Sequence, residues 1–168
     1  MIVIGYQGIG KSTMAKGDMS VIDLESSCYT WGSRKLEDWY KAYADTALHL
    51  SSQGYTVFTA THAPVREWIG LHNTTFNIGV HIDGMYEQQI MAVVPDVRLK
   101  DEWIAKLWKR YEDTKLMKDY CAWMNADDRY IDNVNEILVD SKKYSWKTVI
   151  IPSMEYNLKE LVEKVRNE

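Results

Sequence analysis

Cysteine is scarce in this sequence, and neither of its two residues belongs to a recognisable motif. Cys28 and Cys121 stand far apart, with no Cys-x-x-Cys pair or Cys/His cluster around them. This excludes the usual patterns of a zinc site or a disulfide framework and fits a reducing cytoplasm. Strand-like residues begin at Ile2, which leaves no room for the charged and apolar segments of a signal peptide, so we expect a cytoplasmic protein.

A surplus of positive charge is also missing. The 20 Lys and Arg residues stand against 24 Asp and Glu residues, for a net charge of −4. Proteins that bind nucleic acid through electrostatics usually carry a basic excess, so nucleic acid is not the favoured partner. Hydrophobic residues make up 46% of the chain and charged residues 26%, which is typical of a soluble globular protein and disfavours both membrane insertion and disorder.

The sequence contains no internal repeat, linker or low-complexity segment. Its 168 residues are therefore expected to form a single domain, with a small helical lid around residues 96–118. Five short apolar runs alternate with longer segments of helical pattern, which predicts a three-layer α/β fold with a five-stranded parallel sheet. The expected strands are residues 1–4, 21–24, 56–61, 89–94 and 148–151.

Helical periodicity is visible in most of the segments between these strands. It predicts helices over residues 35–52, 115–139 and 158–165. Another helix is expected to begin at Asp101, a good N-cap residue, and to break near residues 112–114. A further helix should follow Pro64. Between residues 70 and 84, asparagine, threonine and glycine interrupt the pattern, which predicts a loop or small hairpin.

The most specific motif is a phosphate-binding loop. Residues 5–12 match the P-loop pattern G-x-x-x-x-G-K-[ST] without a mismatch, between an expected strand and an expected helix. The glycines allow successive backbone N–H groups to turn inward and form a nest for phosphate. Lys11 is expected to contact the β- and γ-phosphates of ATP, and the Ser12 hydroxyl to bind Mg²⁺. The predicted nucleotide-binding residues are Gly5, Gln7, Gly8, Ile9, Gly10, Lys11, Ser12 and Thr13.

Two devices of other nucleotide-binding proteins are absent from the sequence. The third expected strand ends in Ala60, Thr61 and His62, without the carboxylate with which hydrolases hold Mg²⁺ and a water molecule. This disfavours an ATPase. No Asn-Lys-x-Asp stretch occurs, which disfavours a GTPase.

The second expected strand ends in two carboxylates. Asp23 and Glu25 alternate around Leu24 and therefore project to the same side. Ligands of α/β sheets bind at the carboxyl ends of the strands, so we expect Asp23 to position Mg²⁺ and the pair to contact the acceptor or orient its attacking oxygen. The alternative is that both are solvated strand-end acids or helix-capping groups. Arg66, just after the third strand, offers a fork for an acceptor phosphate, with an ordinary surface arginine as the alternative.

Positive charge gathers between residues 98 and 118, where Lys106 and Arg110 are one helical turn apart. A lid in this place would bring the two cations to one phosphate. The alternative is a solvated helix face on which these cations pair with the interspersed acids.

Trp31 is a candidate for stacking on an acceptor base, because its surroundings are loop-like. His62 is a candidate hydrogen-bond partner of the acceptor, with a structural histidine as the alternative.

The order of these parts resembles that of the nucleoside and nucleotide kinase group of P-loop proteins, in particular the small phage-type deoxynucleoside monophosphate kinases. Residues 5–12 carry the resemblance most strongly. Residues 21–27 resemble the acidic strand end on the acceptor side of that group, where shikimate kinases also keep two alternating carboxylates. Arg66 occupies the place of an acceptor-phosphate arginine, and residues 99–110 look like the lid helix.

The resemblance implies ATP-dependent phosphoryl transfer to a nucleoside monophosphate, in particular a deoxynucleotide, in a bacterial or phage-infected cytoplasm. Two alternatives stay open, namely a kinase of a nucleoside or other small hydroxylated metabolite and a nucleotide-binding switch module with little turnover. The predicted catalytic residues are Lys11, Asp23, Glu25, Arg66 and Arg110, with Mg²⁺ at Ser12 and Asp23 and acceptor-binding roles for Asp23, Glu25, Trp31, His62, Arg66 and Lys106.

Overall fold

The sheet of the computed structural model contains five parallel strands in the order β2-β3-β1-β4-β5. The structure describes residues 1–30, 37–75 and 88–166. The predicted α/β fold with a five-stranded parallel sheet is confirmed, and every strand end lies within two residues of its expected position. The strands are β1 (Ile2–Gly5), β2 (Val21–Asp23), β3 (Thr56–Thr59), β4 (Ile90–Pro95) and β5 (Lys147–Ile151).

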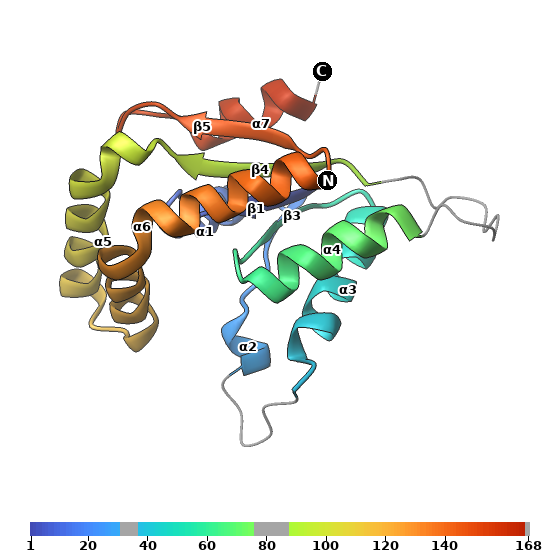
Figure 1. The fold of residues 1–168 in the computed structure, drawn as a ribbon, viewed down its shortest axis with the longest axis horizontal. Helices are drawn as coiled ribbons and strands as arrows, with labels where there is room; N and C mark the ends of the chain where they lie inside the picture. Colours follow the sequence, from blue (N-terminus) through green and yellow to red (C-terminus); the bar gives the residue numbers. More distant parts are fainter. Residues whose placement is uncertain (31–36, 76–87, 167–168) are drawn as a thin grey trace.

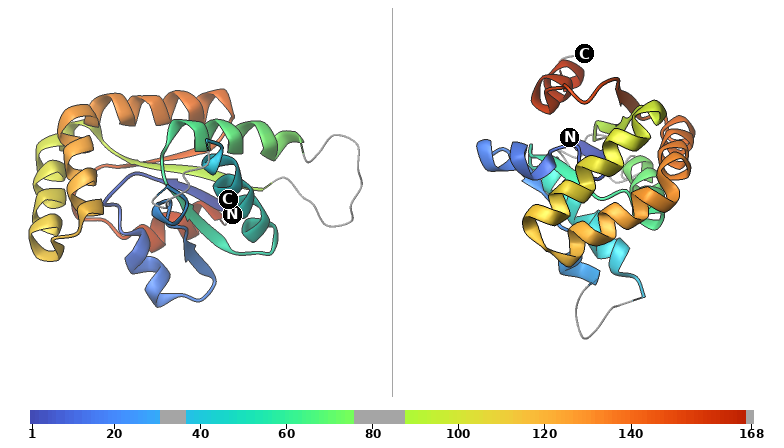
Figure 2. Two further views of the ribbon diagram at one scale, coloured as in Figure 1. Left: turned by 90° about the horizontal axis from the view of Figure 1, so that it is seen from below. Right: turned by 90° about the vertical axis from the view of Figure 1, so that its left-hand side faces the viewer.

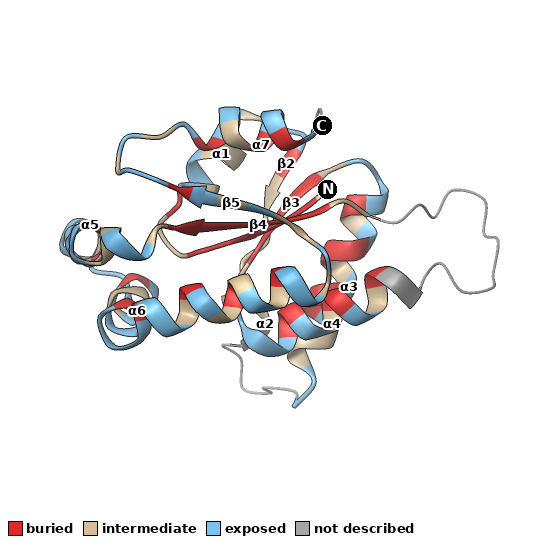
Figure 3. Cartoon of the chain, turned by 45° about the horizontal axis from the view of Figure 1, so that its top comes forward, coloured by how far each residue is buried: buried red, intermediate tan, exposed pale blue. Residues whose placement is uncertain are grey.

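Helices cover both faces of the sheet, as Figure 3 shows. One face carries α1 (Lys11–Gly17) and α7 (Leu158–Arg166), and the other carries α3 (Trp39–Ser52), α4 (Ala63–Thr75) and α6 (Met117–Lys143). The helix α5 (Lys100–Thr114) and the first part of α6 run side by side beyond the carboxyl ends of β4 and β5 (Figures 1 and 2). Two short helices, α2 (Ser27–Thr30) and η1 (Val97–Leu99), follow β2 and β4.

Burial on both sides explains why the central strands are continuous apolar runs. Every residue of β1, β3 and β4 is buried, as parallel strands between two helical layers require. Ile2 and Ile4 pack in one core with α3 and α4, whereas Val3 belongs to the core that includes Leu158 and Val162 of α7. Because all the strands are parallel, their carboxyl ends meet at one edge of the sheet. Among the described residues, no helix has the length and apolar character needed to cross a membrane.

Two helices extend further than the sequence pattern predicts. α4 continues through Gly70 to Thr75, so the predicted loop or hairpin is wrong for residues 70–75, and residues 76–84 lie outside the described residues. A Cβ atom at Gly70 would lie 2.6 Å from the ring of Tyr144, so this glycine makes room for a neighbour and does not end the helix. α6 runs to Lys143, with one non-helical residue at Arg129.

The limits of α5 and α3 also differ from the expectation. Asp101 is not an N-cap, because α5 begins at Lys100, directly after the short helix η1. Asp96 caps η1 by accepting a hydrogen bond from the Arg98 N–H. The predicted break between the two helices is present but lies slightly later, because α5 ends at Thr114, Lys115 adopts a left-handed conformation and α6 begins at Met117. α3 begins at Trp39, and residues 35–36 lie outside the described residues.

The base of α5 packs directly on the glycine-rich loop, residues 5–12. Trp103 and Leu107 are fully buried, and Trp103 Nε1 donates a hydrogen bond of 2.9 Å to the Gln7 carbonyl. A Cβ atom at Gly8 would lie 2.9 Å from Leu107 Cδ2 and 3.3 Å from Trp103 Nε1. Gly8 therefore allows the loop and α5 to approach each other closely, which fixes the base of the helix.

We predict that Gly8→Ala destabilises the protein more than Gly54→Ala. Both glycines have a positive φ, 83° at Gly8 and 94° at Gly54, so alanine adds about 1–2 kcal/mol of backbone strain at each position. Only Gly8 faces packed neighbours, so overpacking adds about 1–3 kcal/mol there. Urea denaturation measures both free energies of unfolding, and equal losses would contradict the close packing of α5 on the loop.

Candidate functional site

The glycine-rich loop connects β1 to α1 at the carboxyl edge of the sheet. Gly8 and Gly10 adopt left-handed conformations, and α1 begins at Lys11 with Gly10 as its N-cap. The Lys11 ammonium donates a hydrogen bond of 2.7 Å to the Gly5 carbonyl. Desolvation lowers the pKa of Lys11, although the charges of Asp23 and Glu25 oppose this shift. The ammonium is therefore held against the loop, where an anion would be a stronger partner than a neutral carbonyl.

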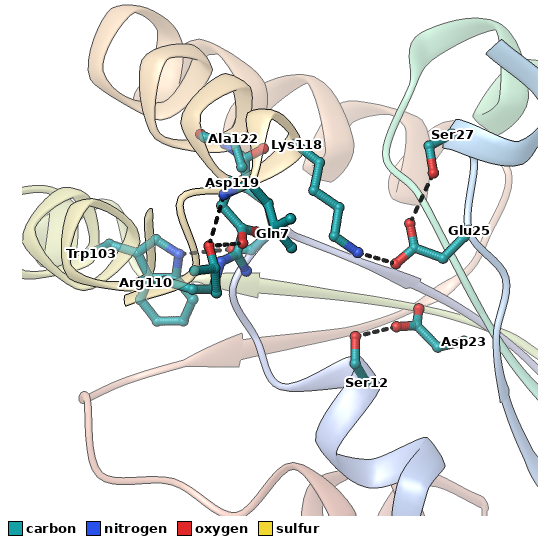
Figure 4. A network of polar contacts seen from close by, with 12 residues as sticks. Gln7, Ser12, Asp23, Glu25, Ser27, Trp103, Arg110, Lys118, Asp119 and Ala122 are labelled. Carbon is teal, nitrogen blue, oxygen red and sulfur yellow. Dashed lines mark hydrogen bonds and ion pairs between the residues drawn. The ribbon is translucent and has the colours of Figure 1, made fainter. Parts of the chain in front are cut away.

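Ser12 and Asp23, the two predicted metal-binding residues, lie in direct contact (Figure 4). The Ser12 hydroxyl donates a hydrogen bond of 2.5 Å to Asp23 Oδ2, so the start of α1 and the end of β2 place two oxygen atoms side by side. In the part of the chain that the structure describes, no group of three or more His, Cys, Asp or Glu residues is placed to hold a metal. Two protein oxygens still fit Mg²⁺, which usually takes its other ligands from water and substrate phosphates.

A large cavity of about 550 Å³ opens at the carboxyl ends of β1, β2 and β3. Its lining includes Lys11, Ser12 and Asp23 together with residues 24–27 and 60–63. Residues of α6 contribute to the lining from the other side. The cavity therefore lies where α/β sheets bind their ligands.

A second cavity, of about 510 Å³, lies between the glycine-rich loop and α5. Thr13 of the predicted nucleotide-binding set lines it, whereas the side chain of Ile9 is buried in the core. The second cavity and the large cavity have four lining residues in common, and these mark the point where a ligand in one cavity would meet a ligand in the other. The shared residues are Gly8, Lys11, Ser12 and Arg110.

Lys106 and Arg110 line the second cavity from successive turns of α5. Lys106 Nζ lies 4.4 Å from the centre of the Trp103 ring and donates a hydrogen bond of 3.1 Å to the Tyr156 hydroxyl. Burial, followed by the nearby charge of Arg110, lowers the pKa of Lys106. Lys109 of α5 lines the same cavity. The contact of Lys106 and Arg110 with one phosphate stays a prediction.

Ion pairs hold the cations of the α5–α6 hairpin in place (Figure 4). Arg110 Nη2 lies 2.9 Å from Asp119 Oδ1, while the buried Nε of Arg110 has no hydrogen-bond partner among the described residues. Lys118 reaches from α6 to the end of β2, where its Nζ lies 3.1 Å from Glu25 Oε1. All four side chains line the large cavity, so an anionic ligand there would compete with these two acids.

Arg66 is buried, with 4% of its surface exposed, so it is not an ordinary surface arginine. Its Nε lies 2.6 Å from Asp140 Oδ2, its Nη2 lies 3.6 Å from Glu136 Oε2, and its Nη1 donates a hydrogen bond to the Thr61 carbonyl. Arg66 lines the large cavity and also connects α4 to α6. Its role as a ligand of an acceptor phosphate stays a prediction.

His62 lines the large cavity beside the acidic end of β2. Its Nε2 lies 3.4 Å from Ser26 Oγ, and its ring packs edge-on against Trp39. Burial, with smaller contributions from Lys11 and Arg66, lowers the pKa of His62. The imidazole is therefore neutral near pH 7, with one nitrogen able to accept a hydrogen bond. Trp31, the predicted stacking residue, lies outside the described residues.

The sequence pattern does not indicate how α6 contributes to the site. Gln7 Nε2 donates a hydrogen bond of 2.7 Å to the Ala122 carbonyl and lies 3.4 Å from Asn125 Oδ1, so the side chain of a predicted nucleotide-binding residue is bound to α6. Arg129 lines the large cavity at the non-helical position of that helix. Helical periodicity predicts α6 itself, but no local motif marks these residues as partners of a loop so far away in the sequence.

No protein-family model matches the chain, and no curated protein matches it at a significant level. The function is therefore inferred from the residues of the site and their geometry.

Proposed function

We propose that this protein transfers the γ-phosphoryl group of ATP to a nucleoside monophosphate. The proposal depends on one observation, the junction of the two cavities at Gly8, Lys11, Ser12 and Arg110. The phosphates of the donor would lie along the glycine-rich loop in the second cavity, and the acceptor would lie in the large cavity. The cations and the hydroxyl group at the junction would then surround the transferring phosphoryl group.

The residues at the junction have distinct tasks in this reaction. An oxygen of the acceptor phosphate attacks the γ-phosphorus while the bond to the bridging oxygen of the leaving ADP breaks. Lys11 and Arg110 stabilise the negative charge on the transferring group and on that leaving oxygen. Bound Mg²⁺ would neutralise charge on the β- and γ-phosphates, with Ser12 and Asp23 as its protein ligands. The acceptor phosphate is already ionised, so its attack needs no general base.

A small neutral acceptor with a hydroxyl group is the second candidate, and one observation favours it. All three nitrogens of the Arg66 guanidinium already have partners, which leaves less positive charge for an acceptor phosphate. A hydroxyl acceptor would have to lose its proton to a base. The carboxylates of Asp23 and Glu25 and the neutral imidazole of His62 line the same cavity.

A screen of acceptors separates the two candidates. Purified protein, ATP and Mg²⁺ are incubated with each ribo- and deoxynucleoside monophosphate and with the corresponding nucleosides, and the products are separated by chromatography. The proposal predicts a nucleoside diphosphate from at least one monophosphate. Product from nucleosides alone would favour the second candidate, and ATP binding without transfer to any acceptor would favour a switch module.

We predict that Lys11→Ala lowers the rate of phosphoryl transfer by about a hundredfold or more while the protein still folds. The lysine stabilises charge on the phosphates and does not belong to the apolar core. Lys16→Ala is the matched control, because Lys16 is an exposed residue of the same helix, and it should keep wild-type turnover. Single-turnover kinetics and thermal unfolding measure both variants. Wild-type turnover by Lys11→Ala would refute the role given to the lysine.

Asp23→Asn and Glu25→Gln are predicted to separate the metal role from the acceptor role. Both variants should lower kcat strongly, with much smaller effects on ATP affinity. Asp23→Asn should also raise the Mg²⁺ concentration at half-maximal rate by about tenfold, because its carboxylate contacts the Ser12 hydroxyl. A magnesium titration of kcat measures this effect. Full activity and unchanged magnesium dependence in both variants would show that the acidic strand end is structural.

Arg110→Ala is predicted to slow the chemical step by about a hundredfold, and Lys106→Ala to slow it less. Because both residues line the second cavity and are predicted to act on one phosphate, the double variant should lose less than the product of the single losses. Lys100→Ala is the control, since Lys100 of α5 lines neither cavity. Single-turnover transfer at saturating ATP measures all four variants. Losses of about tenfold or less would favour a solvated face of ion pairs, and fully independent losses would contradict a shared target.

A further inference from the structure

The large cavity contains two arginines that share one carboxylate. Glu136 Oε1 lies 2.7 Å from Arg129 Nη2, and Glu136 Oε2 lies 3.6 Å from Arg66 Nη2. All three residues line the cavity. A single carboxylate thus bridges two guanidinium groups, one from α4 and one from α6.

Arg129 lines the cavity at a point where α6 is interrupted. Its φ of −135° and ψ of 25° are non-helical, although helix continues on both sides. The next residue, Tyr130, is buried, donates a hydrogen bond of 2.9 Å to the Asp96 carbonyl and packs edge-on against Tyr6. These contacts hold the distortion in place, because α6 contains no proline or glycine that would cause it. A backbone distortion that is fixed by its surroundings and lines a cavity is a common feature of ligand sites.

The carboxylate of Glu136 is the most weakly held member of this group. Arg66 has a closer partner in Asp140, at 2.6 Å, and its 3.6 Å contact with Glu136 is too long for a hydrogen bond. The side chains of Glu136 and Arg129 are 44% and 52% exposed, so solvent screens their attraction and the pair contributes little to stability. Glu136 can therefore turn into solvent at a small cost in free energy.

A phosphate monoester has the charge and the oxygen atoms that two guanidinium groups without Glu136 would bind. Asp140 and Glu136 balance the charges of Arg66 and Arg129. Without Glu136, the group carries a net positive charge at the cavity wall. A phosphate has oxygens spaced much like those of a carboxylate, carries more negative charge, and binds guanidinium groups through paired hydrogen bonds.

We infer that Arg66 and Arg129 bind the phosphate of the acceptor, and that Glu136 competes with this phosphate for the same guanidinium groups. Because the large cavity is taken as the acceptor cavity, the inference rests on the proposed function. Asp140 and the Thr61 carbonyl keep Nε and Nη1 of Arg66, and the phosphate takes the place of Glu136 at Nη2, so the existing partners of Arg66 do not exclude a phosphorylated acceptor.

Isothermal titration calorimetry without ATP tests this site separately from catalysis. The variants are Glu136→Gln and Arg129→Gln, with Glu163→Gln as the matched control, because Glu163 is an exposed, ion-paired acid of α7 that lines neither cavity. Each variant is titrated with the common deoxynucleoside monophosphates, the matching nucleosides and inorganic phosphate. Thermal unfolding checks that each variant folds. Arg129→Lys, which keeps the charge but loses the fork, is measured beside Arg129→Gln.

Arg129→Gln is expected to weaken monophosphate binding by about tenfold or more, the loss of a charged hydrogen bond, with a smaller loss for Arg129→Lys. Glu136→Gln is expected to tighten monophosphate binding by about threefold or more, because a competing charge is removed. Neither variant should change nucleoside binding, and Glu163→Gln should change nothing.

Several results would overturn the inference. One is that Glu136→Gln binds monophosphates more weakly than the wild type, and another is that Arg129→Gln binds them equally well. A third is that the wild-type protein binds neither the monophosphates nor inorganic phosphate.

The proposed function fails separately. If the expected shifts occur but the protein transfers no phosphoryl group from ATP, the phosphate site stands and the kinase proposal falls. If transfer to a monophosphate occurs without the shifts, the kinase proposal stands and this site falls.

Discussion

The contacts of Gln7 with the α5–α6 hairpin are the constraint on which the rest of the site depends. The Gln7 carbonyl accepts a hydrogen bond from Trp103 of α5, and the Gln7 side chain donates one to the Ala122 carbonyl of α6. One residue of the glycine-rich loop is thereby bound to both helices. Because Trp103 is fully buried and packs against Tyr6 and Tyr156, the base of the hairpin cannot shift without disturbing the loop. We therefore expect any closing motion to involve the part of the hairpin beyond Trp103 and Leu107, where Arg110 lies.

Internal partners balance the positive charge that gathers around the glycine-rich loop. Lys11 donates to the Gly5 carbonyl, Arg110 pairs with Asp119, and Lys118 pairs with Glu25. Cations held this close together without partners would repel one another and destabilise the compact state. Phosphates that enter the cavities would replace these internal partners with more highly charged ones. The cations can thus be kept near the loop before any ligand arrives.

Local features of the site can be predicted from the sequence, whereas partners far along the chain cannot. The loop at residues 5–12 needs only a motif, and the contact between Ser12 and Asp23 follows from the position of Asp23 at a strand end. The partners of Arg66 are on α6, and helical periodicity does not report which residues of two helices meet.

Two backbone features of the helices have the same long-range origin. Gly70 stands inside α4, where Tyr144 from the far end of the chain occupies the space that a side chain would need, so this glycine does not mark a helix end. The non-helical conformation of Arg129 could not be predicted from the sequence, because α6 carries no local signal for it and the contacts of the next residue, Tyr130, are with the distant residues Asp96 and Tyr6.

The central claim that follows from the whole arrangement is that donor and acceptor meet at Lys11, Ser12 and Arg110. An analogue that joins adenosine to the acceptor nucleoside through one continuous phosphate chain tests this most directly, because it would fill both cavities at once. Calorimetry should show that it binds about a hundredfold or more tightly than ATP or the acceptor alone, whereas an analogue that binds no more tightly than ATP would contradict a continuous site.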